Sequence, residues 1–455
     1  MGIKNIKLIV SACTVNLLAF AIGNVYAWSS TALVTLKSPD PEVNPLGRPV
    51  TVLEESWIAS LVSLGASCGP LLSGFLAGKL GRKVTLLAFS FPMLVAQIIL
   101  AFASTPAVFY VARFMSGLGV GCGYTVIPMY IGEISETRIR GVLGCILSLF
   151  NALGFLYVIA IGPFVSIKIL SILLMLPVLC FLIFFGCFVP ESPHYYISKG
   201  QYNEAEESLK KLRSKDNSNL KELEDMKETV ERYGGKKTSF LKSLKSRSFR
   251  KGIIITTTLM IFQQFVGITF IQSYMELIFI ASGSTMSSSG SAVIIGVIQV
   301  LGVLVSASLV DRWGRRMLLI LSSFFCAVPL FTLGLFFYLK NIQDVNHLWW
   351  LPVSSLGVYI IGYCSGICTL PWALVGELFS SETKSLAATF SAIVNLFLAF
   401  VVMLAVPIFK EMVGFEGVFW FFSASSLVCA LFVLCYVPET KGKTFQEILT
   451  MLGEK

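Results

Sequence analysis

The stretch Pro190-Glu191-Ser192-Pro193 closes a long apolar region, and Pro438-Glu439-Thr440-Lys441 closes another one 248 positions later. The motif Gly81-Arg82-Lys83 returns in the same way as Gly314-Arg315-Arg316, 233 positions later. A third repeat is an acid followed seven positions later by a base: Glu133 with Arg140, and Glu377 with Lys384. Three motifs that return in the same order at nearly one offset indicate a duplicated architecture. In a hydrophobic chain, such duplication is typical of transporters whose site lies between two halves.

The composition is that of a membrane protein. Hydrophobic residues make up 55% of the chain and charged residues only 13%, against roughly 25% charged residues in soluble domains. Apolar windows of roughly 20 residues, which can cross about 30 Å of hydrocarbon, recur along nearly the whole chain. Twelve membrane spans are predicted, at 8–34, 56–80, 84–104, 106–132, 142–164, 168–189, 252–282, 290–311, 316–339, 349–380, 384–409 and 415–437.

We therefore predict an all-α membrane protein whose twelve transmembrane helices form two pseudo-symmetric six-helix halves. The N-terminal half is expected at 1–189, a helical linker at 190–251, the C-terminal half at 252–437 and a tail at 438–455. In the linker, 204–212 and 220–233 are predicted as short amphipathic helices, and 240–244 as a piece lying on the membrane surface. A linker of about fifty mostly polar residues is too small to enclose a catalytic pocket, so an enzyme is not expected.

The basic residues predict the orientation. Of the 35 lysines and arginines, 29 lie at the termini or in the even-numbered connections, five lie in the odd-numbered connections, and Arg113 lies inside a span. This bias places both termini and the linker in the cytoplasm. Membrane topology thereby explains the net charge of +9, which gives no reason to expect a nucleic-acid partner.

The sequence also argues against a cleaved signal peptide, a metal or cofactor site, a disulfide framework and an ATP-driven pump. Lys4 and Lys7 precede an apolar run as in a signal peptide, but the run is too long and its removal would break the six-plus-six symmetry. The two histidines, His194 and His347, offer no zinc cluster. No metal or other cofactor is expected, no disulfide framework is implied, and the lack of a Walker-type loop excludes pumping by ATP.

The motifs, taken together and in order, carry a family resemblance. Arg113-Phe114 begins a glycine series that ends in Glu133 and Arg140, and Gln263-Gln264-Phe265-Val266-Gly267 opens the seventh span. Asp311-Arg312-Trp313-Gly314-Arg315-Arg316 follows the eighth span. The chain resembles the sugar porters of the major facilitator superfamily over nearly its whole length. The run Pro45-Leu46-Gly47-Arg48, with Glu54-Glu55-Ser56-Trp57-Ile58, resembles in particular the insect facilitated trehalose and glucose transporters.

The resemblance implies facilitated transport of trehalose or a hexose such as glucose. It further implies a monomer embedded in the lipid bilayer of the plasma membrane, with a small-molecule sugar as its substrate. A sugar presents hydroxyls and weakly apolar faces, so its site needs amides or hydroxyls and an aromatic plane. The positions that the resemblance assigns to substrate binding are Gln263, Gln264, Thr269, Tyr274, Gln299, Trp372, Asn395 and Ser148.

Amides within apolar spans are costly unless they are paired or face water. Adjacent residues cannot both face the same way on a helix, so one of Gln263 and Gln264 is expected to line the cavity and the other to brace it. Interhelical hydrogen bonding without substrate is the alternative reading of these amides.

Charged residues at the ends of the spans are expected to form inter-span ion pairs that hold the inner side closed while the outer side is open. The positions that the resemblance assigns to gating are Arg82, Arg113, Glu133, Arg140, Glu191, Asp311, Arg312, Arg315, Arg316, Glu377, Lys384 and Glu439. Anchoring by the positive-inside rule is the alternative for the basic ones.

Five positions depart from the family pattern. Gly78 replaces an acid of the gate, Ser148 a glutamine, Thr269 an asparagine, Leu396 a tryptophan and Cys364 an acid. Most of these changes shorten or remove a sugar-facing group, which favours a wider site or a different specificity.

Facilitated transport is favoured over proton coupling. In symporters of this family, an aspartate in the first span pairs with the arginine equivalent to Arg113, whereas 8–36 contains no acid and the matching position is approximately Ser29. Arg113 is expected to bond to carbonyls or polar side chains of the fifth and sixth spans. Glu276 is the one acid that could replace the aspartate in a symporter. A non-transporting sugar sensor is the other alternative, and the short tail ending at Lys455 argues against it.

Overall fold

The computed structural model describes residues 6–135, 140–213, 223–224, 226–228, 243, 245–379, 383–443 and 445–452. Within these ranges the secondary structure is helical, without a strand. Eleven helical segments of the described chain are long and apolar enough to cross a membrane. One of them, α18 (Lys384–Tyr436), has 53 residues and contains two spans, because Gly414 adopts φ 71° and ψ 176° in its middle. The predicted twelve spans are therefore confirmed.

Six helices form the N-terminal half: α1 (Ile6–Leu36), α2 (Val52–Leu80), α3 (Arg82–Ala101), α4 (Pro106–Ile134), α5 (Arg140–Ile161) and α6 (Ile167–Phe188). The half is held by close helix contacts at small residues. A Cβ on Gly117 would lie 2.1 Å from the Val62 carbonyl oxygen, and one on Gly23 would lie 2.0 Å from that of Asn151. Glycine at these positions lets the backbone of α4 approach that of α2, and the backbone of α1 that of α5. In lipid, such close backbone contact strengthens the van der Waals packing that holds helices together.

The C-terminal half differs because two of its spans are broken. The seventh span consists of α11 (Arg247–Phe265), α12 (Ile268–Ser273) and α13 (Met275–Ser282), with Gly267 at φ 90° in the first break. The tenth consists of α16 (Leu351–Ser365) and α17 (Leu370–Glu377). The remaining spans are α14 (Ser288–Trp313), α15 (Arg315–Lys340) and the two parts of α18.

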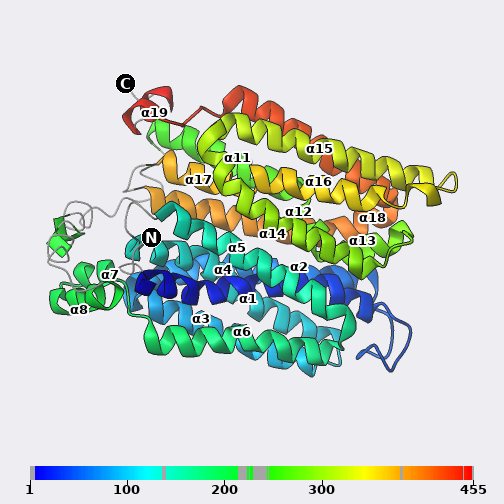
Figure 1. Cartoon of the computed structure of the whole chain (residues 1–455), viewed down its shortest axis with the longest axis horizontal. Helices are drawn as coiled ribbons and strands as arrows, with labels where there is room; N and C mark the ends of the chain where they lie inside the picture. The colour runs from blue at the N-terminus through cyan, green and yellow to red at the C-terminus, as the bar shows by residue number, and fades with distance from the viewer. Residues whose placement is uncertain are drawn as a thin grey trace.

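The two halves lie side by side, with the helices α1 to α6, from blue to teal, below and the helices α11 to α18, from green to red, above in Figure 1. They meet where α2 packs on α18 and α5 packs on α14. The first residues of α1 and the last residues of α18 lie at one end of the bundle, with α7 (Pro193–Ser198), α8 (Tyr202–Leu212) and α19 (Phe445–Leu452) (Figure 1). We call this the termini end and the opposite one the far end.

The linker is described in part. The predicted helix at 204–212 is confirmed as part of α8, which buries Ala205, Leu209 and Leu212 on one face. Of the predicted helix at 220–233 the structure describes 223–224 and 226–228, which are helical, and of the surface piece at 240–244 it describes 243.

Two glycines set the sharp turns of the repeated Gly-Arg motif. Gly81 has φ 98° and ψ 166°, and Gly314 has φ 81° and ψ 161°. These values fall in a region that is open almost only to glycine. Each turn brings a carboxylate against the start of the next helix: a Cβ on Gly81 would lie 2.2 Å from Oε2 of Glu191, and one on Gly314 would lie 2.8 Å from Oε2 of Glu439.

We expect Gly81→Ala to lower the thermal unfolding temperature of the protein in detergent. Alanine there is strained by about 1–3 kcal/mol, and its Cβ displaces the Glu191 carboxylate. Gly78→Ala is the matched control, because a Cβ on that helical residue meets nothing within 4 Å. Equal unfolding temperatures for the two variants would show that the Gly81 turn does not require glycine.

Candidate functional site

Three side-chain amides form one hydrogen-bonded cluster where α11 meets α18. Asn395 is its centre: Nδ2 donates to Oε1 of Gln263 at 2.8 Å, and Oδ1 accepts from Nε2 of Gln264 at 3.0 Å. Oε1 of Gln264 in turn accepts a hydrogen bond from the Thr269 hydroxyl. All four side chains are buried. The structure thus brings together four of the eight positions predicted for substrate binding.

The amide cluster also reaches the breaks in the helices. Nε2 of Gln263 donates to the carbonyl of Ile367 at 2.8 Å and to that of Cys368 at 3.0 Å, both in the interruption between α16 and α17. The Tyr359 hydroxyl donates to the Val266 carbonyl at 3.1 Å, beside the break in the seventh span. Both glutamines bond to Asn395, but of the two only Gln263 also forms hydrogen bonds to described residues of the tenth span.

The other four predicted positions lie outside the cluster. Oε1 of Gln299, on α14, accepts from Nε2 of Gln272 at 3.1 Å. Trp372 and Ser148 are half-buried. Tyr274 is 4% exposed, and within the described part of the chain its hydroxyl has no hydrogen-bond partner.

A set of tyrosines near Cys368, whose carbonyl accepts a hydrogen bond from Gln263, was missed by the sequence reasoning. The Tyr124 hydroxyl on α4 accepts from Nδ2 of Asn151 at 3.2 Å. Tyr124 lies near Tyr26 of α1 and near Cys368 and Tyr363 of the other half. Tyr26, Tyr124 and Asn151 keep part of their surface accessible although they lie in the middle of spans, as side chains that line an internal space do. None of them belongs to a repeated motif, so no signal in the sequence marked them.

Arg113 is buried, 1% exposed, and makes three hydrogen bonds. Nε donates to the Ile58 carbonyl at 3.1 Å, Nη1 to the Val25 carbonyl at 2.8 Å, and Nη2 to the Ser29 hydroxyl at 2.7 Å. Its guanidinium also lies 4.9 Å from the centre of the Trp28 ring. The predicted carbonyl partners are present, but the predicted spans were wrong: the carbonyls come from the first and second spans, whose backbone lies nearer to α4.

At the termini end, the N-terminal half holds a charged cluster. Nη2 of Arg82 lies 2.7 Å from Oε1 of Glu133, and the Ser192 hydroxyl donates to Oε2 of the same carboxylate. Glu191 accepts hydrogen bonds from the backbone N–H groups of Arg82 and Lys83, at 3.0 and 2.9 Å. One carboxylate therefore pairs with the arginine side chain while the other caps the first turn of α3.

The C-terminal half repeats this cluster. Nη2 of Arg315 lies 3.0 Å from Oε1 of Glu377, and the Thr440 hydroxyl donates to Oε2. Glu439 accepts from the backbone N–H groups of Arg315 and Arg316, at 3.0 and 3.1 Å. Neither of the two ion pairs crosses between the halves.

The remaining positions predicted for gating are less engaged. Arg312 and Lys384 form no ion pair with another described residue; the carbonyl of Arg312 accepts from Nζ of Lys441 at 2.6 Å. Nη2 of Arg316 donates to the Leu434 carbonyl. The side chains of Arg140 and Asp311 lie outside what the structure describes.

The two capping carboxylates differ in their proton affinity. Burial raises the pKa of Glu191, and its backbone hydrogen bonds and the nearby Arg82 offset this only in part. Burial acts in the same direction on Glu439, but backbone N–H groups of Lys441, Arg315, Arg316 and Thr440 outweigh it and lower the pKa of that carboxyl. The deeper burial of Glu191 accounts for the contrast.

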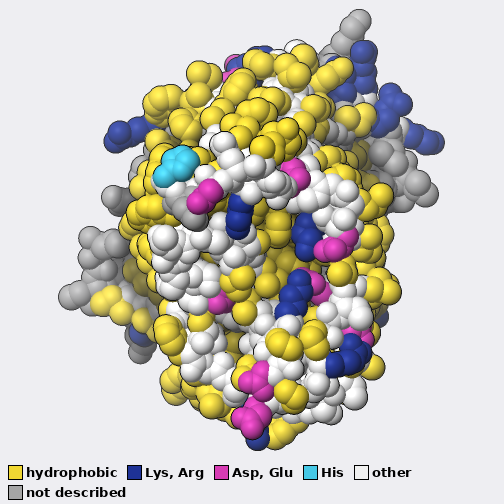
Figure 2. Space-filling view, turned by 90° about the vertical axis from the view of Figure 1, so that its right-hand side faces the viewer, with side chains coloured by type: hydrophobic (Ala, Val, Ile, Leu, Met, Phe, Trp, Pro, Cys, Tyr) yellow, Lys and Arg dark blue, Asp and Glu magenta, His cyan; other side chains and the backbone are white. Residues whose placement is uncertain are grey.

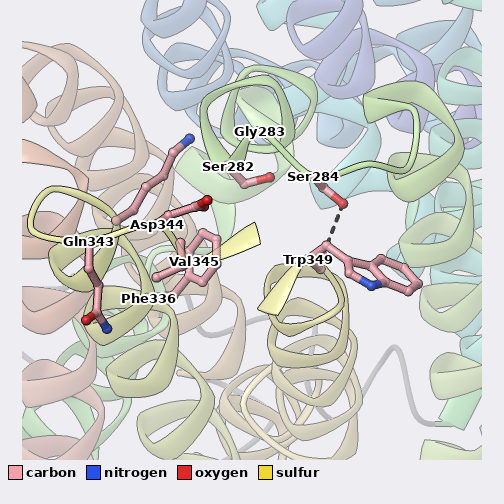
Figure 3. A pocket seen from close by; sticks show the side chains of 9 residues that line it. Ser282, Gly283, Ser284, Phe336, Gln343, Asp344, Val345 and Trp349 are labelled. Atoms are coloured by element: carbon pink, nitrogen blue, oxygen red, sulfur yellow. Dashed lines mark hydrogen bonds between the residues drawn. The ribbon is translucent and has the colours of Figure 1, made fainter. Parts of the chain in front are cut away.

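A cavity of about 150 Å³ at the far end lies apart from these residues. Figure 3 shows Ser282, Ser284, Phe336 and Trp349 around it, all from the C-terminal half. Two of its polar groups are engaged, since the Ser284 hydroxyl donates to the Trp349 carbonyl at 3.1 Å and Nζ of Lys340 to the Ala281 carbonyl at 2.6 Å. Because its lining residues all come from the C-terminal half, the cavity lies off the contact between the halves.

Comparison with known proteins places the chain in a family. Residues 9–452 match the family described as "Sugar (and other) transporter". The chain belongs to the sugar transporter family. This confirms the resemblance seen in the motifs and makes the protein a multi-pass membrane transporter and not an enzyme.

Curated relatives of this sugar transporter come from insects. The facilitated trehalose transporter Tret1-1 of Drosophila sechellia is 34% identical over 445 residues, which cover 97% of this chain and 51% of the relative. The facilitated trehalose transporter Tret1 of Culex quinquefasciatus is 32% identical over 445 residues, which cover 97% of this chain and 84% of the relative. The chain thus spans about half the length of the first relative and most of the second.

The fold of the sugar transporter is confirmed by solved structures. The inward open conformation of the xylose transporter XylE from E. coli matches with a TM-score of 0.80 at 21% identity, covering 97% of this chain and 98% of that one. A structure described as a major facilitator superfamily proton:xylose symporter, XylE bound to 6-bromo-6-deoxy-D-glucose, matches with a TM-score of 0.74 at 22% identity, covering 97% and 99%.

We expect Asn395→Ala to lower the unfolding temperature by more than the loss of an ordinary side-chain hydrogen bond does. It leaves Oε1 of Gln263 and Nε2 of Gln264 without their partner, and each buried unpaired polar group costs about 1–3 kcal/mol. The measurement is thermal unfolding in detergent, with Asn341→Ala as control because that exposed amide makes one bond to Glu416. If Asn395→Ala and the control unfold at the same temperature, water must form hydrogen bonds to Oε1 of Gln263 and Nε2 of Gln264 in place of Asn395.

Proposed function

We propose that this chain carries a sugar, trehalose or a hexose such as glucose, across the membrane down its gradient by alternating access. The observation that carries the proposal is the amide cluster of Gln263, Gln264 and Asn395 at the point where two broken spans meet. Discontinuous helices near the middle of the membrane are typical of transporter binding sites. The insect relatives named as facilitated trehalose transporters support the same substrate class.

The chemistry of the amide cluster suits a polyol. Amides both donate and accept hydrogen bonds, as sugar hydroxyls do, and the bonds that now join the amides to one another can be exchanged for bonds to a substrate. Trp372 and the tyrosines Tyr26, Tyr124 and Tyr363 supply aromatic surface and hydroxyls around it. In this proposal the N-terminal half provides one wall of the site and the amides the other.

The charged residues at the termini end are proposed to have two tasks, to brace each half and to control which side opens. The Arg82–Glu133 and Arg315–Glu377 pairs each brace one half, while the contact seen between the halves at the far end, from the Glu276 N–H to the Ser30 hydroxyl at 3.1 Å, joins α13 to α1. This combination supports an inward-facing state, closed at the far end. Arg140, Asp311, Arg312 and Lys384 are proposed to pair across the termini end when that end closes.

The location of the protein is also a proposal. The excess of lysine and arginine at the termini end supports a cytoplasmic position for it, and plasma membrane and a monomeric state are expected for a sugar porter.

Energy coupling depends on what surrounds Arg113. Its three hydrogen bonds go to two carbonyls and a serine, so none of its partners among the described residues is a carboxylate that could take up a proton. This favours facilitated transport. The symporter alternative rests on Glu276, which is 5% exposed and accepts from the Ser289 hydroxyl at 2.8 Å.

We expect Gln264→Ala to reduce sugar uptake in proteoliposomes by about ten-fold, if it removes one buried hydrogen bond of roughly 1.5 kcal/mol to the substrate. Gln343→Ala, an exposed amide at the far end, is the control and should leave uptake unchanged. Normal uptake of both glucose and trehalose by Gln264→Ala, with normal incorporation into liposomes, would remove Gln264 from the binding site.

We expect initial uptake to be equal with and without an inward-directed proton gradient, and no accumulation above equilibrium. The reason is that Arg113 keeps its charge and its partners do not titrate. Uptake of labelled glucose and trehalose into proteoliposomes measures this. Uphill accumulation driven by pH and abolished by Glu276→Gln would establish the symporter instead.

A further inference from the structure

A second cavity, of about 210 Å³, lies at the far end between the two halves. Lys37 and Glu55 line it from the N-terminal half, and Phe270, Tyr274, Lys410 and Phe415 are among its lining residues from the C-terminal half. Figure 2 views this end of the molecule, where basic and acidic side chains lie close to one another across the face. The cavity is therefore placed where a solute entering between the halves would first meet side chains of both.

One wall of the cavity is aromatic and contains an unpartnered hydroxyl. The rings of Phe270 and Tyr274 are stacked, with centroids 4.7 Å apart and planes 22° apart. Tyr274 is 4% exposed, and its hydroxyl has no hydrogen-bond partner among the described residues. A buried hydroxyl without a partner loses the free energy of its bonds to water. Tyr274 lines the cavity, so a ligand there would lie beside the side chain that lacks this bond.

The other wall carries charges that balance. Nζ of Lys37 lies 2.7 Å from Oε2 of Glu55, whose side chain is 3% exposed. Nζ of Lys410 lies 3.0 Å from Oε1 of Glu411 and 5.3 Å from the centre of the Phe415 ring. Glu411 is not among the lining residues, but both ammonium groups that line the cavity are paired with a carboxylate, so the lining offers donors and acceptors without an unpaired charge. Such a wall favours a neutral ligand with several hydroxyls over an anion or a cation.

The size of the cavity fits one six-membered ring. An apolar protein cavity of about 150 Å³ is enough to bind benzene, so about 210 Å³ leaves room for a ring that carries substituents. A pyranose has an apolar face for the aromatic wall and hydroxyls for the charged one. We propose that this cavity is a second sugar-binding site, which holds a single pyranose ring; the proposal rests on the proposed function as a sugar transporter.

The second site is separate from the amide cluster. Gln264 and Tyr274 are ten positions apart along the seventh span, which corresponds to about 15 Å at the helical rise of 1.5 Å per residue. One ring cannot contact both. The two sites therefore act in series along the path, and a sugar held at the far end is delivered to the amides when the halves move.

The test is the number of glucose molecules bound per purified protein at saturation, measured with labelled glucose in detergent and repeated with labelled trehalose. The wild type should bind two glucose molecules. Glu55→Gln, which breaks the Lys37 pair, and Tyr274→Phe, which keeps the ring and removes only the hydroxyl, should each bind one. Glu54→Gln is the matched control, because this neighbouring carboxylate pairs with Arg48 at 2.6 Å and does not line the cavity; it should bind two.

Gln264→Ala separates this site from the proposed function, since it should lose the glucose at the amide cluster and keep the one at the far end. Thermal unfolding of each variant excludes misfolding as the cause of a lost site. A wild type that binds one glucose, lost in Gln264→Ala and kept in Glu55→Gln and Tyr274→Phe, would overturn the second site and leave the transporter standing. A wild type that binds neither sugar would overturn both.

Discussion

Hydrocarbon offers no hydrogen-bond partner, so each polar group inside the bundle must find its partner within the protein or in a water-filled space. The breaks in the seventh and tenth spans release backbone carbonyls, and Gln263 donates to those of Ile367 and Cys368. Asn395 then ties Gln263 to Gln264. The same constraint explains Arg113, whose guanidinium is held by carbonyls of α1 and α2. The amides therefore gather where helical regularity fails, whereas Arg113 is satisfied by carbonyls of unbroken helices.

Each half completes its own charged cluster. Glu191 and Glu439 occupy equivalent positions against the start of α3 and of α15, and Arg82 and Arg315 pair with Glu133 and Glu377. Because each of these bonds lies within one half, the halves can rotate against each other without breaking them. A rigid unit is what alternating access requires, since small changes at the interface then become large changes at the two ends.

Most of the fold could be predicted from the sequence. Twelve apolar windows long enough to cross the hydrocarbon predict the spans, and three repeated motifs predict the two halves. The break at Gly414 was placed correctly even though the helix is otherwise continuous across it. The partners of Arg113 were not, because they are backbone carbonyls, which every residue has and no pattern marks. Tyr26, Tyr124 and Asn151 were missed for a related reason: a single polar aromatic or amide in a span has no periodicity. Lys37 and Lys410 both line the far-end cavity. They are far apart in the sequence, and only the packing of the two halves brings them together.

The two halves contribute different physical properties to the contact between them. On the C-terminal side, the seventh and tenth spans are interrupted, so Gln263 and Gln264 sit beside segments that can shift when Gly267 and the residues between α16 and α17 change conformation. On the N-terminal side, α1 and α4 are continuous helices of 31 and 29 residues, held closely by glycine contacts and by the three bonds of Arg113. Tyr26 and Tyr124 therefore stand on a stiff wall. In the proposed transporter, the stiff wall would select by shape and the deformable wall opposite would supply hydrogen bonds, so that the same side chains could bind a substrate and then release it on the other side.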